Sequence, residues 1–198
     1  MHKPALLSAS LALCFSLGGC GSETGNASEA EARTAQEKGS GFRGSTVQCR
    51  ITRVADGDTV YCGETGRIRL LMIDAPELSQ GNAGRQAQRV LEGMMPVGTP
   101  VTIETDVRQR DAYQRLLGYI YLNDGRMVNE MMARSGYATA LVYPPNVRYV
   151  DRIRAAVREA QEAKRGLWAT EFFDCSPRDY RAGRCAGARP RNSGRKHD

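Results

Sequence analysis

Hydrophobic and polar residues alternate in short segments between residues 46 and 122, with glycine, aspartate and asparagine between the segments. The segments are rich in β-branched and aromatic residues, a composition typical of β-strands. The sequence predicts five strands, at residues 46–54, 59–63, 67–73, 100–105 and 116–122. Turn residues follow the first, second and fifth of these strands, at residues 56–58, 64–66 and 123–125.

Hydrophobic residues at helical spacing predict three helices. In residues 84–95 the apolar positions recur at i, i+3, i+4 and i+7, and Pro96 ends the pattern. Two further helices are expected at residues 128–134 and 150–165, each ending close to a glycine. Five short strands with helices after the third strand, after the fifth and at the end predict an α+β fold that is mainly β. We expect a five-stranded Greek-key barrel of the OB type with three helices.

The first residues have the pattern of an export signal, with a short basic start, an apolar run and small residues before Cys20. Residues 17–20, Leu-Gly-Gly-Cys, resemble a bacterial lipobox, in which Cys20 would become the lipidated N-terminus. The alternative is an ordinary signal peptide that is cleaved nearby. The expected organisation is a signal peptide at 1–19, a Gly-, Ser- and Glu-rich tether at 20–45, the OB-fold domain at 46–170 and a basic tail with a disulfide loop at 171–198.

Export bears on the remaining cysteines, because disulfides form in oxidising compartments. Cys49 and Cys62 flank a predicted hairpin, so their side chains could meet across two strands, and Cys175 and Cys185 form the second pair by remainder. A zinc site made of all four cysteines is the alternative, but the chain has no Cys-x-x-Cys pair.

The net charge of +6 resides mostly in the last residues, since residues 175–198 hold seven basic and two acidic residues. The overall charge is therefore a poor argument that the folded domain binds nucleic acid. A basic tail could contact a membrane surface or a polyanion, or could simply be solvated.

Three charged residues interrupt an apolar run where packing does not require them: Arg69, Asp74 and Glu77. Pro76 ends the strand there, because proline has no N–H to donate to a β-ladder. Strict side-chain alternation would place Arg69 and Asp74 on opposite faces, so we expect a bulge or bend between them.

Asp58 and Asp74 are hard oxygen ligands that, with a carbonyl and water, could hold Ca²⁺. The only histidines are His2 and His197, so a carboxylate is the available general base, and Glu77 is the best candidate. Arg69 and Arg115 have planar guanidinium groups suited to phosphate oxygens. Taken singly, each residue also has an ordinary structural explanation, such as a turn or a surface charge.

Four segments taken together resemble the staphylococcal nuclease, or thermonuclease, family, in order and at compatible spacing. They are Asp-Gly-Asp-Thr-Val at 56–60, Arg-Leu-Leu-Met-Ile-Asp-Ala-Pro-Glu at 69–77, Asp-Ala-Tyr-Gln-Arg-Leu-Leu-Gly-Tyr-Ile-Tyr at 111–121 and Gly-Arg-Met-Val-Asn at 125–129. The resemblance covers roughly residues 49–168. It implies an OB-fold nuclease that uses Ca²⁺ to hydrolyse DNA and RNA and leaves 3′-phosphate ends.

The resemblance also implies a role for individual residues. Asp58, Asp74 and the carbonyl of Ala75 would bind the metal, Arg69 and Arg115 would hold the scissile phosphate, and Glu77 would activate water. Tyr113 and Tyr143 would line the nucleotide pocket, where aromatic rings suit stacked bases. Three positions depart from the family pattern, Ala112, Gln114 and Leu141, and they affect the expected base preference more than hydrolysis.

We therefore expect a monomeric, lipid-anchored nuclease of the cell envelope. Residue 21, after the lipobox cysteine, is glycine and not the aspartate of a retention signal. In a host with two membranes this favours an anchor in the outer membrane, facing periplasm or exterior. In a host with one membrane the anchor would lie in the cell membrane. The alternative is a non-catalytic OB-fold module that binds nucleic acid or another envelope component.

Overall fold

A computed structural model describes residues 44–185, and every statement below concerns this part of the chain. The predictions for residues 1–43 and 186–198, which include the signal peptide, Cys20 and most of the tether, lie outside the described residues. Five strands close into a barrel in the order β1-β2-β3-β6-β5. They are β1 (Thr46–Val54), β2 (Thr59–Cys62), β3 (Gly66–Leu70), β5 (Pro100–Arg110) and β6 (Leu116–Leu122).

The strand pairing is mixed, with one parallel contact. β3 and β6 run parallel, with Ile68 opposite Leu116, and the other four contacts are antiparallel. A five-stranded mixed barrel with three helices of seven or more residues confirms the predicted OB-type fold class.

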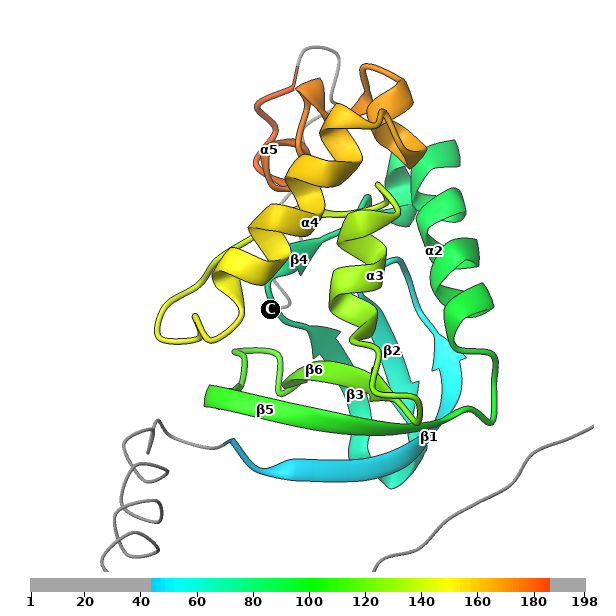
Figure 1. Cartoon of the computed structure of the whole chain (residues 1–198), viewed down its shortest axis with the longest axis vertical. Helices are drawn as coiled ribbons and strands as arrows, with labels where there is room; N and C mark the ends of the chain where they lie inside the picture. Colours follow the sequence, from blue (N-terminus) through cyan, green and yellow to red (C-terminus); the bar gives the residue numbers. More distant parts are fainter. Residues whose placement is uncertain (1–43, 186–198) are drawn as a thin grey trace, which may run out of the picture. The chain divides into compact units, whose positions relative to one another are not determined.

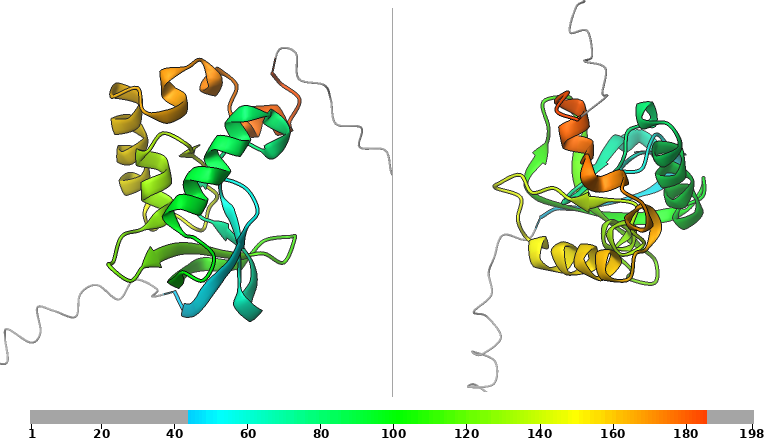
Figure 2. Two further views of the ribbon diagram at one scale, coloured as in Figure 1. Left: turned by 90° about the vertical axis from the view of Figure 1, so that its right-hand side faces the viewer. Right: turned by 90° about the horizontal axis from the view of Figure 1, so that it is seen from above.

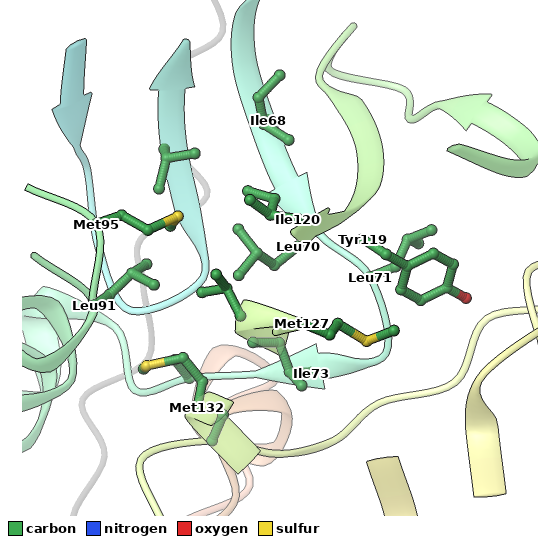
Figure 3. Close-up of a cluster of buried hydrophobic side chains, with 14 of the residues drawn as sticks. Ile68, Leu70, Leu71, Ile73, Leu91, Met95, Tyr119, Ile120, Met127 and Met132 are labelled. Atoms are coloured by element: carbon green, nitrogen blue, oxygen red, sulfur yellow. The ribbon is translucent and has the colours of Figure 1, made fainter. Parts of the chain in front are cut away.

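The three predicted helices are α2 (Asn82–Met94), α3 (Val128–Arg134) and α4 (Val150–Glu162). Figure 1 shows them gathered on one side of the barrel, where they cover the end away from β1 and β5. Their apolar faces pack into the barrel core, which Figure 3 shows in close-up, and Leu91 of α2 and Met132 of α3 belong to the same buried cluster as Leu70 and Ile73. Burial of these faces holds the helices in place, because removing apolar surface from water is the main favourable contribution to folding. No helix between residues 44 and 185 has the length and apolar character needed to cross a membrane.

The prediction of one continuous strand over residues 67–73 is wrong. β3 ends at Leu70, and a turn at Leu71 and Met72 leads into the two-residue strand β4 (Ile73–Asp74), which pairs with β7 (Thr139–Ala140). Met72 has a φ of 66°, a left-handed backbone conformation that is uncommon for residues with a Cβ atom. The chain therefore leaves the barrel wall at Leu70, and Asp74 belongs to a separate small sheet.

Asn129, at the start of α3, holds this turn against the barrel. Its side chain is fully buried, accepts a hydrogen bond from Ile120 N at 2.9 Å and donates one to Leu71 O at 2.8 Å. Because unpaired polar groups are costly in a protein interior, the amide ties β6, α3 and the β3–β4 turn into one unit. This unit supports the segment that carries Asp74 and Glu77.

Residues 171–185, predicted as part of a basic tail with a disulfide loop, are folded. Phe173 packs with Ala83 and Leu167 in a second small hydrophobic cluster, and α5 (Pro177–Arg181) follows. Both predicted disulfides are present, Cys49–Cys62 and Cys175–Cys185, with Cα–Cα distances of 5.7 and 5.6 Å. Regular secondary structure thus continues past residue 170, as far as Arg181.

Candidate active site

One open cavity of about 990 Å³ collects most of the candidate residues. Asp58, Arg69, Glu77 and Arg115 line it, as do the two predicted tyrosines, Tyr113 and Tyr143. The side chains come from the β1–β2 turn, from β3, from the segment after β4, from the β5–β6 loop and from the loop after β7 (Thr139–Ala140), so the fold unites segments that are far apart in the sequence. Six arginines and four acidic residues line the cavity, a balance that suits a negatively charged ligand with a bound cation.

Arg69 lies at the centre of the charged residues. Its Nη2 is 3.0 Å from Asp58 Oδ2 and 3.1 Å from Asp74 Oδ1, and its Nη1 donates to the carbonyl of Ile73 at 2.9 Å. The turn at Met72 makes these contacts possible, because it brings Asp74 back toward the side of β3 that carries Arg69. The expected bend between Arg69 and Asp74 is therefore a tight turn between two strands.

Asp58 and Asp74 are both buried carboxylates, 7% and 1% exposed. Asp58 also accepts hydrogen bonds from the amide N of Ala75 at 2.9 Å and from Thr59 Oγ1 at 3.1 Å. Burial raises the pKa of Asp74, and this effect outweighs the opposing hydrogen bond from Arg181 and the charge of Arg69. A cation next to Asp74 would therefore stabilise the charged form of this carboxylate, which burial has deprived of water.

Asp56, next to Asp58, has a pKa raised to about 6, chiefly by burial and further by the negative charge of Asp58. Its carboxylate accepts the backbone N–H of Asp58 at 3.0 Å and so shapes the turn that presents Asp58.

The donor set agrees with a hard cation better than with zinc. Asp58 and Asp74 each place an oxygen within hydrogen-bond distance of the same nitrogen, Arg69 Nη2, so their oxygens converge on a small volume. Within residues 44–185 no group of three or more His, Cys, Asp and Glu side chains has metal-ligating spacing. A cation held by two carboxylates needs carbonyl and water oxygens as well, which Ca²⁺ accepts and structural zinc does not. Ala75 contacts Asp58 through its N–H, and the role of its carbonyl as a metal ligand stays a prediction.

Arg115 is held by Asp111, with Nε 2.7 Å from Oδ2. Burial acts to raise the pKa of Asp111, but the hydrogen bonds and charge of Arg115 outweigh it and leave the pKa below its ordinary value. Asp111 also accepts the backbone N–H groups of Tyr113 and Arg115, at 2.9 and 3.0 Å, and so closes the β5–β6 loop. The guanidinium is thereby oriented on the cavity wall.

Tyr113 and Tyr143 are exposed, at 78% and 58%, on the rim of the cavity. Arg115 Cζ lies 5.5 Å from the centre of the Tyr113 ring. The loop that carries Tyr143 is fixed by buried Asn146, whose side chain bonds the backbone N and O of Arg108 at 2.7 and 2.8 Å. Exposed aromatic rings beside guanidinium groups are suited to stacking on bases.

Comparison with known proteins now decides the family. A family model described as staphylococcal nuclease homologue matches residues 67–170. The chain belongs to the staphylococcal nuclease family. Asp58 lies ahead of the segment matched by the family model.

Individual relatives agree with this assignment. The chain is 32% identical to a thermonuclease of Staphylococcus hyicus over 128 residues, which are 61% of this chain and 75% of the relative. It is 34% identical to a thermonuclease of Staphylococcus intermedius over 126 residues, 60% of this chain and 74% of the relative. It is 33% identical to endonuclease YncB of Bacillus subtilis over 137 residues, 64% of each chain.

Sequence reasoning missed Arg181 in α5, which contacts two of the predicted site residues. Its Nη2 lies 2.9 Å from both oxygens of Asp74, and its Nη1 lies 3.0 Å from Glu77 Oε1. Burial lowers the pKa of this guanidinium, but its bonds to Asp74 and Glu77 more than compensate and leave the pKa above its ordinary value. The available signal was Ser176-Pro177, a typical helix start between two cysteines, although it says nothing about where the helix docks.

Proposed function

We propose that this protein is a Ca²⁺-dependent nuclease that hydrolyses phosphodiester bonds of DNA and RNA and leaves 3′-phosphate products. The observation that carries the proposal is the convergence of Asp58, Arg69, Asp74, Glu77 and Arg115 in a member of the staphylococcal nuclease family. Each of these charges has a use in phosphodiester hydrolysis.

Asp58 and Asp74, with the carbonyl of Ala75, would hold the cation. The bound cation would supply positive charge next to the phosphate. Glu77 would take a proton from the attacking water, a task that falls to a carboxylate because the described residues include no histidine. Arg69 and Arg115 would bind phosphate oxygens and stabilise the negative charge that develops on them.

The alternative of a non-catalytic OB-fold binding module has less support. A module that only binds would need the arginines and tyrosines of the cavity. It would not need two buried carboxylates at 7% and 1% exposure, with Glu77 beside them on the cavity wall. The cost of burying these carboxylates favours a catalytic use.

Nuclease assays of the full chain test the proposal. We expect cleavage of single-stranded DNA and of RNA with added Ca²⁺, no cleavage with excess chelator, and recovery when Ca²⁺ is restored. End analysis should find 3′-phosphates. Binding of DNA without any product at saturating Ca²⁺ would favour the binding module instead.

The proposal includes an anchor in the cell envelope through lipidated Cys20, supported by the Leu-Gly-Gly-Cys pattern at 17–20. Cells that express the chain should incorporate labelled fatty acid into it, and Cys20→Ser should abolish the label. Equal labelling of the variant would rule out this anchor.

A further inference from the structure

The C-terminal helix places a positive charge on the very carboxylates that the proposed mechanism uses. Arg181 contacts both oxygens of Asp74 at 2.9 Å and Glu77 Oε1 at 3.0 Å, so one guanidinium engages a metal ligand and the proposed base together. The Arg181 side chain is 30% exposed, whereas that of Asp74 is 1% exposed. Charge-assisted contacts of this kind are stronger than neutral hydrogen bonds and become stronger still in a partly dry site.

Several contacts outside the site hold α5 in position. Ser176 Oγ accepts the backbone N–H of Asp179 at 3.1 Å and so caps the helix, and Tyr180 Oη donates to Ser79 O at 3.2 Å. Ser79 belongs to the short 3-10 helix Leu78–Gln80 that precedes α2, and Figure 2 shows α5, in orange-red, near that end of α2. The Cys175–Cys185 disulfide closes a loop around the helix. Arg181 is thus presented by a folded element.

Arg181 and a divalent cation cannot use Asp74 at the same time. Arg69 Nη2 bonds Oδ1 of Asp74, and Arg181 Nη2 bonds both Oδ1 and Oδ2, so a cation can reach Oδ2 only once Arg181 has moved away. Binding of a cation therefore requires Arg181 to leave, and the apparent dissociation constant equals the intrinsic constant divided by the fraction of molecules in which Arg181 has left. The disulfide keeps the guanidinium close by, so it competes at a high effective concentration.

We infer that Arg181 is an autoinhibitory residue that competes with Ca²⁺ for Asp74 and Glu77, and that the disulfide loop 175–185 delivers it to the site. The inference rests on the proposed function, since it takes Asp74 as a metal ligand. The loop follows residue 170, where the match to the family model ends, so it is an addition to the part of the chain that defines the family.

Calorimetric titration of the full chain with Ca²⁺ tests the inference. We compare the wild type with Arg181→Gln, which keeps polarity and much of the length but removes the charge. The matched control is Arg178→Gln, an exposed arginine of the same helix that does not line the cavity. Arg181→Gln should lower the dissociation constant for Ca²⁺ about tenfold, and the control should leave it unchanged. An equal or higher dissociation constant for Arg181→Gln overturns the inference.

A second variant tests the role of the disulfide. The double variant Cys175→Ser/Cys185→Ser opens the loop and so raises the entropic cost of placing Arg181 at Asp74. It should lower the dissociation constant for Ca²⁺, but by less than Arg181→Gln does. An unchanged value overturns the part assigned to the disulfide. Calorimetry measures Ca²⁺ binding independently of DNA cleavage. A lower dissociation constant for Arg181→Gln, in a protein that cleaves no DNA, would refute the proposed function and still support the competition between Arg181 and Ca²⁺.

Discussion

Replacement of Glu77 by glutamine is expected to lower kcat for DNA cleavage by about 10²- to 10⁴-fold, the range that a general base contributes. Glutamine keeps the shape of the side chain and can accept a hydrogen bond, but it cannot take a proton from water. Glu77 begins the short 3-10 helix Leu78–Gln80, and Gln80 Oε1 accepts its backbone N–H at 2.9 Å, a contact that the variant retains. The loss should therefore lie in catalysis and leave the fold intact.

The measurement is kcat on single-stranded DNA at saturating Ca²⁺, with a urea unfolding curve for each variant. Glu92→Gln is the matched control, because Glu92 is an exposed residue of α2 that does not line the cavity. It should keep wild-type kcat. Full activity of Glu77→Gln would remove Glu77 from its assigned role and leave the general base unidentified.

Replacement of Arg115 by lysine is expected to lower kcat by about 10²- to 10³-fold, as does loss of one oriented donor to a developing negative charge. Lysine keeps the charge but not the planar fork. Asp111 occupies Nε, and within residues 44–185 the two Nη groups have no hydrogen-bond acceptor. The Nη groups are the ones suited to two phosphate oxygens.

A close control exists in the same protein. Arg126 forms the same type of pair with Asp124, with Nε 2.8 Å from Oδ2, but it is exposed and lies away from the cavity. Steady-state kinetics of Arg126→Lys should match the wild type, which separates loss of the fork at the phosphate from loss of an Arg–Asp pair. Wild-type kcat in Arg115→Lys would show that charge alone suffices at this position.

The patterns that identify the barrel and its helices are local. Alternation of apolar residues predicts β1 and β6 with their ends as found, and the apolar stripes of α2 and α4 predict those helices to within a few residues. The sequence predicts a strand at residues 100–105, but β5 continues to Arg110, which pairs with Leu116 of β6 after a register shift beyond Thr105. Pairing of this kind depends on a partner elsewhere in the chain.

The sequence by itself determined the order and spacing of the charged residues, and these resembled one family closely enough to suggest a role for each. It could not determine how Arg69 and Asp74 meet, because a left-handed turn at a methionine has no local signal. Nor could it place Arg181, since the position of α5 depends on a disulfide, a small hydrophobic cluster and contacts with residues about a hundred positions earlier in the chain. Local patterns indicate secondary structure, whereas only the packing of distant segments decides which charges share one site.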